Sequence, residues 1–82
     1  MIITLQNGVK VNKGYAVTAE RYDKGIMTPV FMTVNGEPSF APKEAFISTF
    51  EDDAKTVIKW FKDTQQNRRY TWKVTPFERL VE

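Results

Sequence analysis

Residues 48–61 read STFEDDAKTVIKWF and predict the one helix around which the rest of the chain is organised. Hydroxyl residues stand at its start, and Ser48 with Glu51 matches the Ser-x-x-Glu capping box. Two aspartates follow in the first turn, where the positive end of the helix dipole stabilises negative charge. The apolar residues that define a buried stripe at helical spacing are Ala54, Val57, Ile58 and Phe61. We therefore expect a helix that docks this stripe on a sheet and ends near residues 65–67.

The chain before this helix alternates between apolar and polar residues, as half-buried strands do. Asn7-Gly8 and Asn35-Gly36 are hairpin signals, because a type I′ turn needs positive φ at both central positions. Pro29 has no N–H group to donate, so its strand must lie at a sheet edge or contain a bulge there. The predicted strands cover residues 2–6, 9–22 and 26–34.

A fourth strand is predicted after the helix, over residues 70–76, because apolar and polar residues alternate again. Between the third strand and the helix, residues 42–46 fit one helical turn with proline at its first position. A length of 82 residues suits one domain, so residues 1–82 are treated as a single unit. The predicted fold is α+β: a small β-β-β-α-β domain whose antiparallel sheet carries one helix packed on one face.

The composition argues against several kinds of chemistry. The chain has no cysteine and no histidine, which excludes thiolate nucleophiles, Ser-His catalysis and the usual structural zinc sites. Asp53 and Lys55 are spaced like the acid-x-lysine pair of metal-dependent nucleases. Such pairs lie on strands, where residues i and i+2 share a face, and these two fall in a predicted helix. We expect no enzyme, no cofactor and no metal site.

Three features bear on location. No window approaches the ~20 consecutive apolar residues of a membrane span. The start, Met1 to Leu5, lacks the basic region and the long apolar stretch of a signal peptide. The absence of cysteine fits a reducing compartment. The expectation is a cytoplasmic protein without a membrane partner.

Trp60 lies about 100° around the helix from the centre of the buried stripe. It either caps the edge of the core or stays partly exposed, in which case it would anchor a protein partner. Phe31 points to the strand face opposite Val30, and that face is apolar and open if the helix covers only one side. The predicted partner-binding residues are Trp60, Phe31, Arg68, Arg69 and Tyr70.

Charge is distributed unevenly along a chain whose net charge is only +2. Residues 55–73 carry six basic side chains and one acid, whereas residues 44–53 carry four acids and no base. Basic residues beside aromatic rings can neutralise phosphates and stack on bases, although lysines on a helix are more often simply solvated. The residues of this alternative, a nucleic-acid-binding surface, are Lys55, Lys59, Lys62, Arg68, Arg69 and Lys73.

The stretch from Thr49-Phe50 through Ala54 to Trp60, preceded by three predicted strands, resembles a known DNA-binding family. It is similar to the arm-type domain at the amino end of phage-type tyrosine integrases, over about residues 9–62. That resemblance implies DNA binding through the sheet. This chain departs from the pattern in its fourth strand and in the few cations of its sheet.

A compact, cysteine-free β-β-β-α-β chain also resembles, in size class, the small accessory proteins of phages and mobile elements. Many of those, including anti-CRISPR and anti-restriction proteins, act by occluding a host protein. We therefore predict a non-catalytic protein-binding module or inhibitor of this type, whose partner is a host protein or a nucleoprotein complex. The alternatives are nucleic-acid binding and a homodimer built by edge pairing or by the uncovered sheet face.

Overall fold

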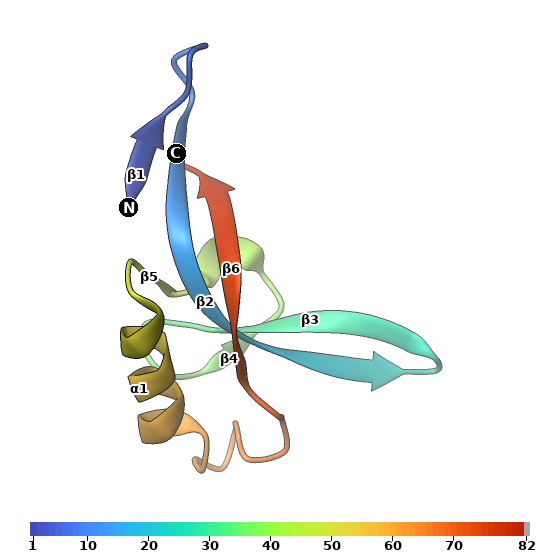
Figure 1. The fold of residues 1–82 in the computed structure, drawn as a ribbon. Coiled ribbons are helices and arrows are strands. Elements are labelled where there is room, and N and C mark those ends of the chain that lie inside the picture. Colours follow the sequence, from blue (N-terminus) through green and yellow to red (C-terminus); the bar gives the residue numbers. More distant parts are fainter. Residues whose placement is uncertain (82) are drawn as a thin grey trace.

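The computed structural model describes residues 1–81 and shows a curled antiparallel sheet with one α-helix (Figure 1). The elements are β1 (Ile2–Thr4), β2 (Lys10–Asp23), β3 (Ile26–Met32), β4 (Pro38–Ser39), the 3-10 turn η1 (Pro42–Glu44), β5 (Ile47–Ser48), α1 (Glu51–Phe61) and β6 (Lys73–Leu80). The predicted α+β class is confirmed, and so is the helical turn that begins at Pro42. The predicted β-β-β-α-β order is approximate, because it lacks the two short strands β4 and β5.

Strand β2 is the central strand of the sheet. Along one edge it pairs with β6, and along the other it pairs in turn with β1, β5 and β3. A Cβ at Gly14 would lie 2.8 Å from Cγ2 of Ile47, so the missing side chain lets β5 approach β2 closely. Beyond this point β2 curves, and the β1–β2 and β2–β3 hairpins extend as two separate arms (Figure 1). Strand β4 pairs only with Phe31 and Met32 of β3. Pro29 lies in the part of β3 that pairs with β2 alone, which is at the edge of the sheet.

Helix α1 is shorter than predicted and starts differently. Its first residue is Glu51. The N-cap residue is Phe50, and no side-chain hydrogen bond caps the start of the helix. The hydroxyl of Ser48 accepts a bond from the Phe50 N–H (3.2 Å) and donates one to the Phe50 carbonyl (2.9 Å), so the predicted capping box is wrong. The helix ends at Phe61, because the side-chain amide of Asn67 donates to the Phe61 carbonyl at 3.0 Å and turns replace the next helical bonds. In the part of the chain that the structure describes, no helix is long and apolar enough to cross a membrane.

The main core lies between α1 and one face of the sheet. Ala54 is fully buried there, and the other members of the predicted stripe are partly buried against the same cluster. The sheet contributes Val17, Ala19, Val30 and Met32. The predicted helix-on-sheet packing is therefore confirmed for this face. The start of β6 is later than predicted, since Tyr70 belongs to a turn that its N–H closes on the Asn67 carbonyl.

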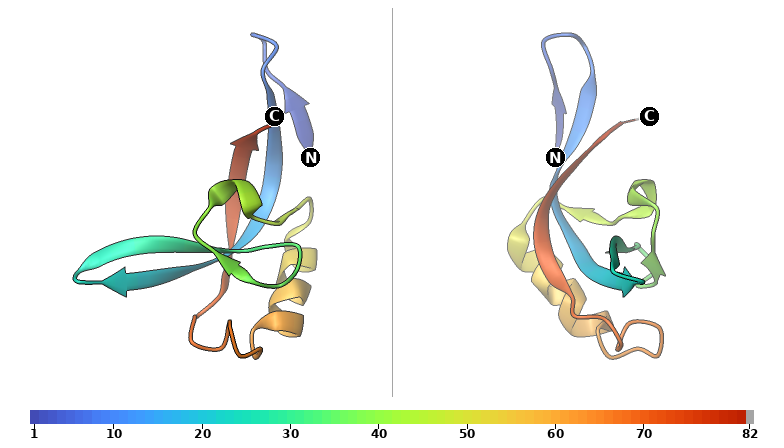
Figure 2. Two further views of the ribbon diagram at one scale, coloured as in Figure 1. Left: turned by 180° about the vertical axis from the view of Figure 1, so that it is seen from behind. Right: turned by 90° about the vertical axis from the view of Figure 1, so that its right-hand side faces the viewer.

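The opposite face of the sheet is covered by the segment that contains η1. In the right-hand view of Figure 2, η1 and α1 lie on opposite sides of β6. One nitrogen of Arg79, Nη1, donates to the carbonyl oxygens of Pro42, Lys43 and Ala45 at 3.0, 2.7 and 2.8 Å. The rings of Phe31 and Phe77 contact each other in a tilted arrangement, with centroids 5.3 Å apart, and Phe31 is only 8% exposed. The expectation of an open apolar face at Phe31 is therefore wrong.

Candidate partner-binding surfaces

Trp60 is the most prominent exposed ring on the helix. It is 67% exposed, although the next residue, Phe61, packs against the core. The two rings meet edge to face, with centroids 6.5 Å apart and an interplanar angle of 83°. Phe61 is fixed in turn by Gly36, where an added Cβ would lie 2.7 Å from the ring carbon Cε1. The indole is therefore largely exposed to solvent, next to a ring that packs against the core.

Other exposed apolar side chains were not singled out from the sequence. Phe50 immediately precedes α1, and Val34 lies in the turn between β3 and β4, beside the glycine that contacts Phe61. Both are among the exposed large hydrophobic residues. Val34 belongs to the end of the predicted strand over residues 26–34, but β3 ends at Met32 and leaves Val34 in a turn. Phe50 precedes the first helical residue and so lies outside the repeating pattern of the helix.

The predicted basic surface is divided by the sheet. Lys73 pairs with Thr18 across β2 and β6, and the Thr18 hydroxyl contacts that of Thr75 at 2.7 Å. These side chains point away from the face on which α1 packs, because strand residues alternate between faces and Val74 packs against the helix-side core. Lys73 therefore does not join the helix lysines, and the expectation of one continuous patch is wrong at this residue.

Two of the predicted cations also have acidic partners. Lys55 forms an ion pair with Glu51 at 3.7 Å, and Lys73 forms one with Glu20 at 3.4 Å. The remaining four have no ion-pair partner within residues 1–81: Lys59, Lys62, Arg68 and Arg69. Among the six predicted cations, those without an ion pair thus lie on α1 and in the loop that follows it.

Arg69 and Tyr70 lie in that loop. The guanidinium carbon of Arg69 is 5.1 Å from the centroid of the Tyr70 ring, which is a cation–π distance. Tyr70 is half-buried and meets Trp72 edge to face at 5.5 Å, so it contributes to the edge of the core. Of the five predicted partner-binding residues, Phe31 is removed to the far face of the sheet, whereas Trp60 and Arg68 to Tyr70 stay on or near the surface.

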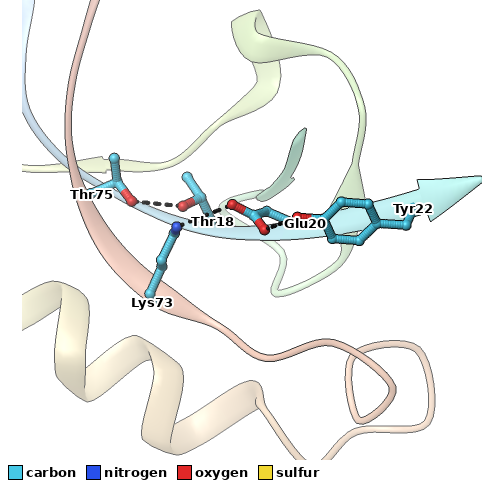
Figure 3. Close-up of polar contacts among 5 residues, drawn as sticks. All are labelled: Thr18, Glu20, Tyr22, Lys73 and Thr75. Atoms are coloured by element: carbon cyan, nitrogen blue, oxygen red, sulfur yellow. Dashed lines mark hydrogen bonds and ion pairs between the residues drawn. The ribbon is translucent and has the colours of Figure 1, made fainter. Parts of the chain in front are cut away.

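A polar network lies on the face of the sheet to which Lys73 of β6 points (Figure 3). The hydroxyl of Tyr22 donates to Oε2 of Glu20 at 2.8 Å, and Lys73 approaches Oε1 of the same carboxylate at 3.4 Å. These bonds lower the pKa of Glu20, chiefly through the Tyr22 hydroxyl, and the same bond raises the pKa of Tyr22. Together with Arg69 and Thr71, the three residues line a shallow groove.

No group of three or more acidic side chains within residues 1–81 is placed to hold a metal ion. Comparison with known proteins adds no relative: no family model matches the chain, and neither a curated protein nor a solved structure matches it.

Proposed function

We propose that the chain is a non-catalytic protein-binding module that covers part of the surface of a host protein, as small inhibitors and accessory proteins do. The observation that carries the proposal is the exposure of Trp60 on a helix whose other face is anchored in the core. A large aromatic side chain on a helix that is docked on the core is typical of the residues that dominate binding energy at protein interfaces.

The magnitude of the available burial supports this role. An aromatic side chain buries about 150–250 Å², and about two thirds of the Trp60 surface is open. At ~25 cal/mol per Å², complete coverage of this surface contributes roughly 2–4 kcal/mol of binding free energy. That is the range of a hot-spot residue.

The charge near the helix indicates the kind of partner. Lys59, Lys62 and Arg68 lie on α1 or in the loop after it and have no ion pair within residues 1–81. An acidic partner surface would complement these cations and would accelerate encounter at low salt. Because Lys62 lies about 160° around the helix from Trp60, we expect this acidic surface on the flank of the helix opposite the indole.

The test is quantitative capture from nuclease-treated lysate of the native host, with mass spectrometry of the retained proteins. Trp60→Ala is compared with Ile26→Ala, which removes a side chain of similar exposure (69%) at the tip of the β2–β3 hairpin. We expect one protein to be retained by wild type and Ile26→Ala, and to be reduced roughly tenfold or more by Trp60→Ala. Equal retention by folded Trp60→Ala, or no retained protein, contradicts the proposal.

Nucleic-acid binding is a second candidate, favoured by the four cations without ion pairs. If they neutralise phosphates, affinity for labelled DNA or RNA falls steeply between about 50 and 200 mM salt. Lys62→Ala should lower the slope of log affinity against log salt by about one. Lys73→Ala, on the other face and paired with Glu20, should leave the slope unchanged. Absence of binding at ~50 μM in low salt ends this candidate, because non-specific affinity commonly reaches ~1–100 μM even at physiological salt.

A further inference from the structure

Strand β6 has one free edge. It pairs with β2 over the stretch from Val11 to Thr18, and no other strand in residues 1–81 pairs with it. Figure 1 shows β6 accompanied by β2 along one side only. Such an edge carries a row of unpaired backbone N–H and C=O groups and is a template for another strand.

The direction of these backbone groups follows from one hydrogen bond. The N–H of Val81 donates to the carbonyl of Lys10 at 3.0 Å, which continues the β2–β6 ladder by one residue. Hydrogen-bonded and non-hydrogen-bonded pairs alternate in an antiparallel ladder. The backbone N–H and C=O groups of the odd-numbered residues of β6 therefore point toward β2. The residues whose backbone groups point to the free edge are Val74, Pro76, Glu78 and Leu80. Pro76 is tolerated because its missing N–H belongs to this outward set.

We propose that the free edge of β6 pairs with β6 of a second copy of this chain, antiparallel about a two-fold axis at Phe77. Regular pairing must oppose outward residues to outward residues, which leaves three central registers. An axis at Pro76 opposes two prolines, neither of which donates. An axis at Glu78 opposes two carboxylates, and like charges directly opposite each other are destabilising.

The axis at Phe77 avoids both conflicts. Val74 then lies opposite Leu80 of the second copy, and Pro76 lies opposite Glu78, which still donates its N–H. Phe77 meets Phe77 of the second copy, and no like charges are opposed. This register forms about six backbone hydrogen bonds across the contact. It also places an apolar neighbour beside Leu80, which is 67% exposed in the single chain.

The self-complementary pairing is the reason to expect a second copy rather than another peptide. An isologous contact repeats every favourable pair about its axis. The proposal does not depend on the proposed function, because Trp60 and the helix lysines take no part in it. Since β6 is short, the interface is small, and we expect a weak, reversible dimer.

The first test is sedimentation velocity from ~10 μM to ~1 mM, with two substitutions at one residue. Glu78→Pro removes an N–H that points to the free edge and leaves the β2–β6 bonds intact. Glu78→Ala is the matched control: it keeps the N–H and loses only the exposed ion pair with Lys13, which is 3.5 Å long. We expect wild type and Glu78→Ala to dimerise alike, and Glu78→Pro to dimerise about tenfold more weakly or not at all.

A single cysteine tests the axis directly, since the chain has none. In the proposed register the two residues at position 77 form a non-hydrogen-bonded pair with Cα atoms about 4.5 Å apart, within disulfide reach. Oxidised Phe77→Cys should therefore form a covalent dimer at concentrations where Thr71→Cys, outside β6, does not. This measurement decides the matter if Glu78→Pro fails to fold.

Several results would overturn the proposal. Wild type that stays monomeric up to ~1 mM shows that the edge does not pair. If Glu78→Pro still dimerises, the contact lies elsewhere on the molecule. If Glu78→Ala also fails to dimerise, the contact depends on the side chain of Glu78 rather than on its N–H. Cross-linking of Thr71→Cys in preference to Phe77→Cys excludes the axis at Phe77.

Discussion

The side-chain amide of Asn67 donates a 2.7 Å hydrogen bond to the carbonyl of Gly36, which lies 31 residues earlier in the chain. Asn67 is fully buried, and its Nδ2 also donates to the carbonyl of Phe61. Its own backbone carbonyl accepts the indole N–H of Trp72 at 3.1 Å. One residue thus joins the turn after β3, the end of α1 and the entry to β6, and it supports the helix end from which Trp60 projects.

Replacing Asn67 should therefore destabilise the domain more than any neighbouring loop substitution. Asn67→Ala leaves the Gly36 carbonyl without its donor and removes one of the donors to the Phe61 carbonyl, which costs about 1–3 kcal/mol of unfolding free energy. Urea denaturation measures the difference. Gln66→Ala, at an exposed neighbour, should change stability by no more than about 0.5 kcal/mol. Equal effects of the two substitutions would contradict the structural role assigned to Asn67.

Gly36 is needed for two separable reasons. Its φ of +76° disfavours any other residue, and a Cβ would overlap the ring of Phe61. Gly8 has a similar φ of +85°, but nothing lies within 4 Å of an added Cβ, so it isolates the conformational cost. We expect Gly8→Ala to cost about 1 kcal/mol and Gly36→Ala about 2–4 kcal/mol in thermal or urea unfolding. If both cost the same, the contact with Phe61 contributes nothing.

Arg79 holds the η1 segment over the second face of the sheet through its bonds to three carbonyls. Arg79→Met keeps the aliphatic stem and removes these donors, and should cost about 1.5–3 kcal/mol. Hydrogen exchange gives a local readout, because the N–H of Phe46 donates to the Met32 carbonyl just beyond η1. Exchange at Phe46 should accelerate in Arg79→Met and not in Lys10→Met, whose exposed side chain makes no such bonds. Unchanged exchange at the Phe46 N–H in Arg79→Met would show that Arg79 does not hold the η1 segment in place.

The pair of Glu20 and Tyr22 predicts a pH dependence with a defined sign. The pKa of Glu20 is lowered from 4.5, so its contribution to stability is present above that value and is lost as pH falls through the folded-state pKa. The pKa of Tyr22 is raised from 10.0, so its contribution is present below that value and is lost as pH rises through the folded-state pKa. Carboxyl titration by NMR should show a higher Glu20 pKa in Tyr22→Phe and also in Lys73→Ala, because each substitution removes a group that lowers it. An unchanged Glu20 pKa in Tyr22→Phe would contradict the role of the tyrosine hydroxyl.

The periodic parts of the molecule were predictable from sequence, whereas contacts between irregular segments were not. Ala54 and its neighbours at helical spacing indicated the docking face of α1, because burial imposes that period. The outward direction of Lys73 was also available from sequence, since Trp72 and Val74 on either side are apolar. The covering of Phe31 and the early helix end at Phe61 were not. The first depends on the η1 segment, whose carbonyls Arg79 binds, and the second depends on Asn67, which binds the Phe61 carbonyl from the following loop. Loop residues of this kind leave no repeating pattern along the chain.

The contrast between the two tryptophans provides a final prediction. Trp60 is 67% exposed and Trp72 is 9% exposed with its N–H bonded to Asn67, so their environments differ sharply. Trp60→Ala should leave stability within about 0.5 kcal/mol of wild type, and the remaining Trp72 fluorescence should resist acrylamide quenching. Trp72→Phe should cost about 2–4 kcal/mol by opening a cavity and removing one of the two donors to the Asn67 carbonyl. The fluorescence of the remaining Trp60 should be readily quenched. A destabilised Trp60→Ala variant would mean that the indole supports the fold, and loss of partner capture in that variant would then carry no information about binding.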